Sequence, residues 1–184
     1  MTLTPKKTGW IETICGPMFS GKTEELIRRL IRAQIAKQKA AIFKPKIDNR
    51  YSEDFIVSHN NRRISSISIN KPSDILKFQQ QADVIGIDEA QFFDNSIINV
   101  ISKLASNGKR VIIAGLEKDF MGKAFGSMPE LLVQSEYVTK VLAICVQCGD
   151  PANFTQRLTK EAKQILVGES DKYEARCRRC FNPE

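Results

Sequence analysis

Short apolar runs and longer amphipathic stretches alternate along the chain. The apolar runs are rich in β-branched residues and contain few polar positions, a pattern typical of parallel strands buried on both faces. The stretches between them repeat their apolar residues at helical spacing, as Leu26, Ile27 and Leu30 do. The predicted strands span residues 10–15, 40–44, 84–87, 110–115 and 137–144.

The predicted helices lie between these strands. The first follows residue 22 and runs to about residue 39. A second begins after Asp94 or Asn95 and stops at Gly108, and short helices are predicted over 72–81 and 129–134. Strands that alternate with helices predict an α/β fold, in which helices cover both faces of a parallel sheet.

Two stretches depart from this alternation. Residues 45–61 are polar and turn-prone, and a connection of that length without periodicity is usually functional. Residues 63–69 partly alternate, like a strand with one solvated face. After Ile144 the apolar content falls, and so short a segment cannot build its own core. We therefore expect a larger α/β domain over 1–143 and a smaller domain over 144–184.

Composition narrows the class of protein. The chain has 184 residues and a formal net charge of +7. That charge suits either nucleic acid or phosphorylated small ligands, and the absence of a basic block favours the ligands. No apolar run reaches transmembrane length, and residues 1–9 lack the apolar core of a signal peptide. We expect a cytoplasmic protein with neither a nucleic-acid partner nor a membrane partner.

A phosphate-binding motif stands between the first predicted strand and helix. The two glycines of G-x-x-x-x-G-K-T let backbone N–H groups surround an anion, and the helix N-terminus adds favourable charge. Lys22 can reach the β- and γ-phosphates, and the Thr23 hydroxyl can ligate Mg²⁺. The alternative is a chance glycine turn before an amphipathic helix. The motif comprises Gly16, Pro17, Met18, Phe19, Ser20, Gly21, Lys22 and Thr23.

Two acidic residues, Asp88 and Glu89, end the apolar run 84–87. Ligands in a parallel α/β sheet bind at the carboxyl ends of its strands. One carboxylate can therefore hold Mg²⁺, and the other can take a proton from the attacking oxygen. An acidic cap of the following helix is the alternative. The pair alone does not decide whether that oxygen belongs to water or to an alcohol.

Four of the five cysteines form two C-x-x-C pairs, Cys145 with Cys148 and Cys177 with Cys180. Four thiolates at this spacing fit tetrahedral Zn²⁺, and a closed Cys₄ site is structural because it leaves no position for water. A redox C-x-x-C or unrelated thiol pairs are the alternatives. Cys15 is expected to be a small core residue.

Several single residues allow two interpretations. On spacing alone, Asp48 and Arg50 are more typical of a solvated turn than of a ligand site, and His59 of a hydrogen bond within a loop. Four phenylalanines follow the ends of two predicted strands, where they can pack in the core or form a wall for a flat ring. They are Phe92, Phe93, Phe120 and Phe125.

Taken together, these motifs resemble thymidine kinase of the zinc-containing type II group, found in bacteria and in the animal cytosol. The resemblance runs in order from Gly9 through nearly the whole chain. It rests on the phosphate-binding motif, both C-x-x-C pairs, Asp48-Asn49-Arg50-Tyr51, Asp88-Glu89-Ala90-Gln91-Phe92-Phe93, Gly115-Leu116, Asp119-Phe120, Phe125-Gly126 and Asp171-Lys172-Tyr173.

The resemblance implies a P-loop (RecA-like) α/β fold with a zinc domain, and transfer of the ATP γ-phosphate to the 5′-hydroxyl of thymidine. It assigns the general base to Glu89, and the Mg²⁺ and ATP contacts to the phosphate-binding motif, Asp48, Asn49, Arg50, Asp88, Glu89, Ala90 and Gln91. It assigns the thymidine contacts to Met18, Phe92, Leu116, Phe120, Phe125, Gln164, Ile165, Leu166, Val167, Gly168 and Tyr173. It also implies a homotetramer and feedback inhibition by dTTP.

The residues from Gln164 to Gly168 belong, in that family, to a lasso loop that covers the thymine. The chain departs from the family pattern where Gly168 is followed by Glu169-Ser170, and where Glu117 replaces a common aspartate. Two other functions share the same motifs. One is a nucleic-acid-dependent ATPase, and the other is a zinc-built interaction module with a degenerate nucleotide site.

Overall fold

A computed structural model describes residues 8–47, 55–57, 63–159 and 172–183. Its centre is a six-stranded sheet with the strand order β5-β2-β6-β7-β1-β8, and every pair of neighbours runs parallel. The strands are β1 (Trp10–Cys15), β2 (Ala40–Pro45), β5 (Ile67–Ile69), β6 (Val84–Ile87), β7 (Arg110–Gly115) and β8 (Tyr137–Lys140).

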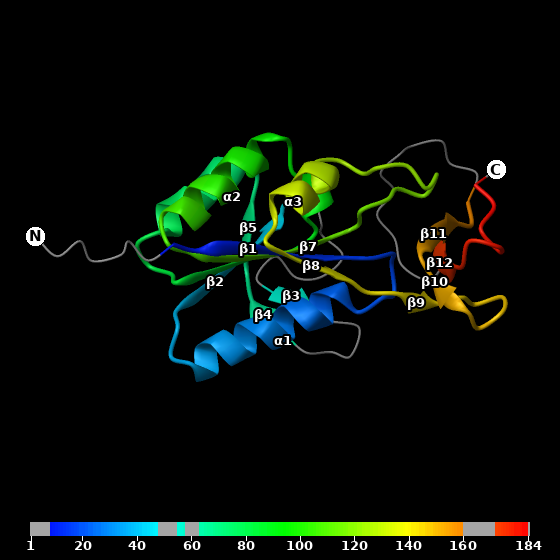
Figure 1. The fold of residues 1–184 in the computed structure, drawn as a ribbon, viewed down its shortest axis with the longest axis horizontal. Coiled ribbons are helices and arrows are strands. Elements are labelled where there is room, and N and C mark those ends of the chain that lie inside the picture. The colour runs from blue at the N-terminus through cyan, green and yellow to red at the C-terminus, as the bar shows by residue number, and fades with distance from the viewer. Residues whose placement is uncertain (1–7, 48–54, 58–62, 160–171, 184) are drawn as a thin grey trace, which may run out of the picture.

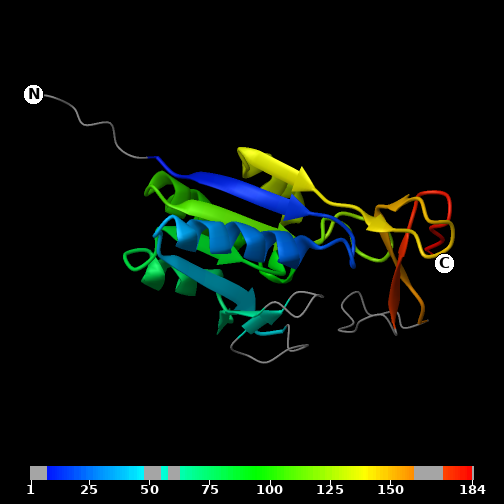
Figure 2. The same ribbon diagram turned by 90° about the horizontal axis from the view of Figure 1, so that it is seen from below.

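Helices cover both faces of this sheet, as Figure 1 shows, so the predicted α/β fold is confirmed. Helix α1 lies on one face, and α2 and α3 lie on the other. Figure 2 views the sheet from the α1 side. The helices are α1 (Lys22–Ile35), α2 (Ser96–Ser106) and α3 (Met128–Gln134), with 3₁₀ turns η1 (Pro72–Phe78) and η2 (Ala90–Phe92).

Strand β7 illustrates why the sheet is buried on both sides. Val111 and Ile113 belong to the apolar cluster beneath α2 and α3, whereas Ile112 and Ala114 belong to the cluster beneath α1. Successive side chains of a strand point to opposite faces, so an unbroken apolar run supplies both cores. The run 110–115 therefore has no solvated face, as its sequence predicted.

Helix α1 packs closely on its face because β6 contains a glycine. Leu26, Ile27 and Leu30 of α1 are fully buried against the sheet. A Cβ at Gly86 would lie 2.9 Å from Cδ1 of Leu30, which is too near for two carbon atoms. The missing side chain of Gly86 therefore sets how near the helix can come to the sheet.

One carboxylate is buried in β1, where the sequence predicted an apolar strand. Glu12 accepts hydrogen bonds from Trp10 Nε1 at 2.7 Å, from Arg29 Nη1 at 2.8 Å and from Arg110 Nε at 2.5 Å. Burial opposes ionisation of Glu12, but the hydrogen bonds and positive charges of these neighbours outweigh it and hold its pKa below the ordinary value. This network joins β1 to α1 and β7.

Two of the predicted strands are each divided in the structure. The predicted strand 63–69 is two strands, because β4 (Arg63–Ser65) pairs with β3 (Phe55–Val57) while β5 joins the main sheet. The predicted strand 137–144 also divides. Its first part is β8, and β9 (Ala143–Ile144) pairs with β10 (Pro151–Ala152) instead of β1. Strand β3 was not predicted at all.

Beyond β9 the chain forms two small antiparallel sheets. Strands β9 and β10 make one, and β11 (Phe154–Arg157) pairs with β12 (Tyr173–Arg176) in the other. We call residues 143–159 and 172–183 the cysteine module. Figures 1 and 2 show it beyond the end of the main sheet, on the side where the parallel strands finish. In the described part of the chain, no helix is both long and apolar enough to cross a membrane.

Candidate active site

The phosphate-binding motif connects β1 to α1 at the carboxyl edge of the sheet. A Cβ at Gly16 would lie 2.2 Å from the carbonyl oxygen of Val141, so a larger residue does not fit there. Gly21 begins α1 in the left-handed region, with φ of 81°. The Lys22 side chain is buried, and its Nζ donates to the carbonyl oxygen of Pro17 over 2.7 Å. The loop therefore curls around the Lys22 amine, as phosphate binding requires.

The end of β6 lies directly against this loop. Thr23 Oγ1 is 3.2 Å from Oδ2 of Asp88 and 3.4 Å from Oδ1. Asp88 is 5% exposed, so its carboxylate is aimed at the loop and away from bulk solvent. A hydroxyl and a carboxylate that face one another are oxygen ligands of the kind that Mg²⁺ takes beside substrate phosphates. Thr23 and Asp88 therefore form the part of the site that fits a magnesium ion.

Glu89 adopts a backbone conformation that is unusual for its residue type. Its φ is 51° and its ψ is 42°, in the left-handed region that non-glycine residues seldom occupy. Its N–H donates to Asp88 Oδ1 over 3.0 Å, so the two acids are joined through the backbone. Strain of this kind gathers at functional sites, because it aims a side chain in a direction that ordinary helix or strand geometry does not allow.

Gln91 holds the Glu89 carboxylate in place. Its Nε2 donates to Glu89 Oε2 over 2.5 Å, and its Oε1 accepts the N–H of Leu116 over 2.9 Å. Gln91 is 3% exposed. The amide therefore links the end of β6 to the chain that leaves β7. The predicted contact residues Glu89, Gln91 and Leu116 lie together in one hydrogen-bonded unit.

The four phenylalanines have different surroundings. Phe92 and Phe125 pack edge to face, with ring centroids 5.8 Å apart and an interplanar angle of 88°. Phe93 is 5% exposed and belongs to the main apolar core. The Phe120 ring lies under the guanidinium of Arg157, whose Cζ is 3.6 Å from the ring centroid. Core packing thus accounts for Phe93, and the other three lie outside the apolar clusters that fill the two faces of the sheet.

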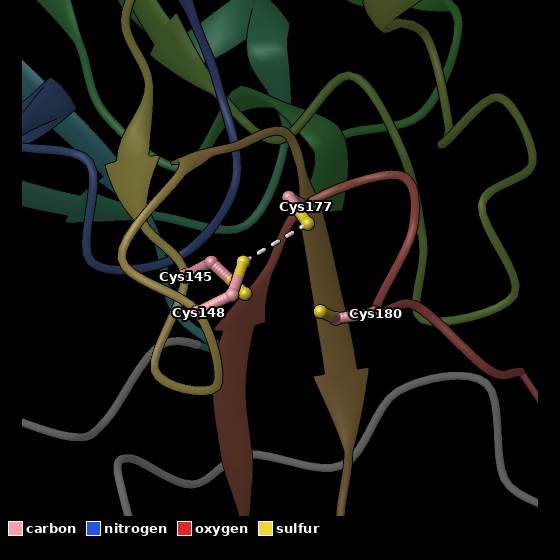
Figure 3. Close-up of side chains that lie close together, drawn as sticks. All are labelled: Cys145, Cys148, Cys177 and Cys180. Atoms are coloured by element: carbon pink, nitrogen blue, oxygen red, sulfur yellow. Dashed lines mark hydrogen bonds between the residues drawn. The ribbon is translucent and has the colours of Figure 1, made fainter.

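The four cysteines of the two C-x-x-C pairs come together, as predicted. Figure 3 shows Cys145 and Cys148 on one segment facing Cys177 and Cys180 on the other. All four Sγ atoms lie within 4.8 Å of one another, and those of Cys148 and Cys177 are 3.6 Å apart. With zinc–sulfur bonds of about 2.3 Å, tetrahedral sulfur atoms lie roughly 3.8 Å apart. The cluster therefore fits a structural Zn²⁺.

The cysteine module contacts the phosphate-binding loop directly. The N–H of Met18 donates to Thr155 Oγ1 on β11 over 3.0 Å. Phe19 packs on the small apolar cluster that includes Cys145 and Cys177. The Phe19 φ of 64° is also left-handed. Contacts with the cysteine module thus support Met18 and Phe19 of the phosphate-binding loop.

A second contact runs from the loop after β7 to the same module. Lys118 Nζ lies 4.7 Å from the centroid of the Phe154 ring, and Phe154 stacks on Phe181 with centroids 4.4 Å apart. A Cβ at Gly122 would lie 3.2 Å from the Phe181 ring, and the Gly122 φ of 74° also favours glycine. Figure 1 shows this loop reaching from β7 toward β11. The cysteine module therefore contacts both the phosphate-binding loop and the loop after β7.

Cys15 ends β1 directly before the phosphate-binding loop, and Glu117 lies in the loop after β7. Both carboxylate oxygens of Glu117 are buried, and Lys140 Nζ is 3.0 Å from Oε1. Burial raises the pKa of the Cys15 thiol, and the Glu117 carboxylate adds to the effect. Cys15 is 2% exposed and belongs to the main core, as the sequence predicted. It is therefore a neutral packing residue at neutral pH.

Two residues that the structure brings to this site, Thr155 and Arg157, were not predicted. Neither belongs to a motif, and both follow Phe154 in a short strand. Thr155 and Arg157 lie in a short strand of mostly polar residues, whose pattern does not predict that the arginine is buried among partners. The predicted contacts Asp48, Asn49, Arg50 and Gln164 to Gly168, and the loop residue His59, lie outside the described residues.

Comparison with known proteins identifies related sequences. A sequence model of the family described as "Thymidine kinase" matches residues 9–181. A thymidine kinase of Rhodothermus sp. (strain ITI 518) is 55% identical over 175 residues, which cover 95% of this chain and 82% of that protein. Thymidine kinases of Bacteroides thetaiotaomicron and Bacteroides fragilis are each 55% identical over 176 residues, 96% of this chain and 88% of each relative.

Proposed function

Since this chain belongs to the thymidine kinase family, we propose that it transfers the γ-phosphoryl group of ATP to the 5′-hydroxyl of thymidine, giving thymidine monophosphate and ADP. The observation that carries this proposal is the position of Glu89. It lies at the end of β6, one residue after the acid that faces Thr23 of the phosphate-binding loop, and Gln91 holds its carboxylate. Membership of the family also favours this function over the ATPase and the degenerate nucleotide site.

Each of these residues has a task in the transfer. The backbone of the loop and the Lys22 amine bind the phosphates and oppose the charge that develops on them. Thr23 and Asp88 would hold a magnesium ion, which would supply positive charge against the phosphates when bound. Glu89 accepts the proton of the 5′-hydroxyl while the 5′-oxygen forms a bond to the γ-phosphorus. The bond between the γ-phosphorus and the oxygen that links it to the β-phosphate breaks, and ADP leaves with that oxygen.

The aromatic residues supply the nucleoside side of the site in this proposal. Phe120 lies in the loop after β7 and Tyr173 begins β12, yet Arg157 lies near both rings, with its Cζ 3.6 Å from the first centroid and 5.4 Å from the second. Flat rings of this kind stack on a pyrimidine. The Zn²⁺ that the four cysteines would hold would join the segment after β9 to the end of β12, the strand that begins at Tyr173.

The test is a phosphorylation assay with ATP labelled in the γ-phosphate. We expect labelled thymidine monophosphate in the presence of thymidine, and none with 5′-deoxythymidine, which lacks the acceptor hydroxyl. A panel with deoxyuridine and deoxycytidine measures the breadth of acceptance. Phosphate release that depends on a polynucleotide, without nucleotide product, would contradict the proposal and favour the nucleic-acid-dependent ATPase.

We also propose that the chain forms a homotetramer in the cytoplasm and that dTTP inhibits it. The resemblance to the type II group supports these three points. Light scattering measures the assembly, and cell fractionation measures the location. Because dTTP carries both a thymidine and a triphosphate, it should compete with both substrates. Inhibition patterns that are competitive with neither thymidine nor ATP would contradict the feedback proposal.

A further inference from the structure

Arg157 is a buried cation where the cysteine module meets the loop after β7. It ends β11 and lies opposite Tyr173 of β12 in the antiparallel pair. Its residue is 7% exposed. Its Nη2 donates to Tyr173 Oη over 2.8 Å, and its Cζ lies 3.6 Å from the centroid of the Phe120 ring. One guanidinium therefore contacts two aromatic side chains that are far apart in the sequence.

The geometry of this contact needs an arginine. A planar guanidinium can stack on a ring while its N–H groups donate at the edge, and the ammonium of lysine cannot do both. The distance of 3.6 Å is that of a stacked contact, whereas the distance of 5.4 Å to the Tyr173 ring is longer. The guanidinium thus covers one face of Phe120 and binds the hydroxyl of Tyr173. Arg157 therefore acts on Phe120 through stacking and on Tyr173 through a directional hydrogen bond, in addition to its charge.

The path of the loop that carries Phe120 is fixed separately. Asp119 Oδ1 accepts the N–H groups of Met121 and Lys123, each over 2.9 Å, and the Asp119 N–H donates to the Lys123 carbonyl over 2.9 Å. These bonds close the turn without any contribution from Arg157. The turn around Asp119 therefore holds the backbone beside Phe120, and Arg157 contacts the Phe120 ring.

We propose that Arg157 is a positioning residue that sets the spacing and orientation of Phe120 and Tyr173, and through them the affinity for the pyrimidine nucleoside. This inference rests on the proposed function, in which Phe120 and Tyr173 contact thymidine. The ligand class it concerns is a flat, uncharged pyrimidine that contacts aromatic side chains which the protein has already aligned. Arg157 acts through these two residues, so its loss should be felt by the nucleoside and not by ATP.

The experiment compares Arg157→Lys and Arg157→Gln with the parent enzyme by initial rates, varying thymidine and ATP in turn. Lysine keeps the charge, and glutamine keeps a planar donor without the charge. We expect the KM for thymidine to rise about tenfold in both variants, because neither restores the stacked and hydrogen-bonded arrangement. The KM for ATP should stay within about twofold, since ATP is bound at the phosphate loop.

Arg178→Lys is the matched control. Arg178 belongs to the same module and lies over an aromatic ring, Phe154, at 5.4 Å, but it is exposed and contacts neither Phe120 nor Tyr173. Its substitution should leave both KM values unchanged. Zinc per chain and melting temperature are measured for every variant. Tyr173→Phe provides a milder probe that removes only the hydroxyl, and we expect it to raise the thymidine KM about threefold.

A double-mutant cycle with Phe120→Leu tests the contact itself. If Arg157 acts through the Phe120 ring, Arg157→Lys should raise the thymidine KM less in the Phe120→Leu variant than in the parent, since only the contact with Tyr173 is left to lose. Thymidine KM values for Arg157→Lys and Tyr173→Phe equal to that of the parent would overturn the inference and leave the proposed function intact. Equal rises in both KM values, or independent effects in the cycle, would reduce Arg157 to a structural role. A parent enzyme that does not phosphorylate thymidine would overturn both.

Discussion

The side-chain amide of Gln91 donates to the carboxylate of Glu89 over 2.5 Å, and its oxygen accepts the N–H of Leu116 over 2.9 Å. The amide group is planar, so these two bonds fix each other's direction. Glu89 is thereby aligned with the chain that leaves β7, although it belongs to the chain that leaves β6. The proposed base therefore depends on a neighbour that takes no proton itself.

Replacing Gln91 with leucine should slow turnover while the fold persists. Leucine has a similar volume but cannot hold the Glu89 carboxylate, and a small misplacement of a catalytic group is costly in rate. We expect kcat to fall roughly tenfold or more. Steady-state rates measure this. Gln134→Leu is the control, because that glutamine is exposed and only bonds Ser102. Similar kcat values for the two variants would contradict the role of Gln91.

Glu89→Gln should have a larger effect on the same step. The amide is nearly isosteric but cannot accept the proton of the 5′-hydroxyl. We expect kcat to fall by roughly 10²–10⁴-fold, with ATP binding largely retained. Exposed Glu130 gives a matched control, Glu130→Gln, which should behave like the parent enzyme. Normal turnover by the Glu89 variant would place the base elsewhere.

Loss of the metal should be felt at the phosphate-binding loop. We expect Cys148→Ser to lower the zinc content and to loosen the module between the cysteine pairs. Met18 and Phe19 then lose their contacts with Thr155 and the apolar cluster of the module, so binding of both substrates should weaken. Atomic absorption measures zinc per chain. Cys15→Ala is the control, because Cys15 lies in the main core and its loss should leave zinc unchanged. Full zinc occupancy in Cys148→Ser would contradict the assignment.

Most of the central sheet could be predicted because its strands are short apolar runs of unmistakable type. The predictions of a single strand over 63–69 and over 137–144 were wrong for the same reason. Alternation reports whether a residue is extended, but it does not report which partner the strand has. Ser66 separates a strand that pairs with β3 from one that pairs with β2, and Val141 follows the last residue of β8 that pairs with β1. Partners at such distances are set by tertiary packing.

The same limit applies to the site. Its motif residues could be predicted because their chemistry requires fixed spacing, as with the phosphate-binding loop and the cysteine pairs. Arg157 and Thr155 have no such signature, since each acts through a residue more than ten positions away. Glu12 is an intermediate case. A carboxylate within an apolar strand calls for a buried cation, but the sequence does not choose among the many arginines.

Glu12→Gln should reveal that buried network through its pH dependence. The folded pKa of Glu12 lies below the ordinary value of 4.5. The network therefore stabilises the fold fully above that pH, and its contribution is lost as the pH falls through the lower folded value. At pH 7 we expect the variant to lose about 2–4 kcal/mol of unfolding free energy, because Arg110 is left without its carboxylate.

Urea unfolding at several pH values measures this difference, which should shrink on acidification below about pH 4.5. Asp74→Asn is the control. Its pKa is also lowered, by a hydrogen bond from Lys77, but that pair lies on the surface, so its loss should not be measurable. A difference between Glu12→Gln and the parent that is the same at every pH would mean that packing, and not charge, accounts for the loss.

Gly126 lies against the backbone of Gln91. Its substitution separates the cost of a left-handed backbone from the cost of a steric clash. Its φ is 51°, and a Cβ there would lie 2.3 Å from the carbonyl oxygen of Gln91. Gly149 has a similar φ of 78°, but a Cβ there would have no atom within 4 Å. Gly149→Ala therefore suffers only the backbone cost, about 1 kcal/mol, and should keep its kcat. Gly126→Ala must also displace Gln91, so we expect a larger loss of stability and a fall in kcat. Equal losses of stability and unchanged kcat in both variants would show that the position of Gln91 tolerates the shift, and that Glu89 does not depend on it.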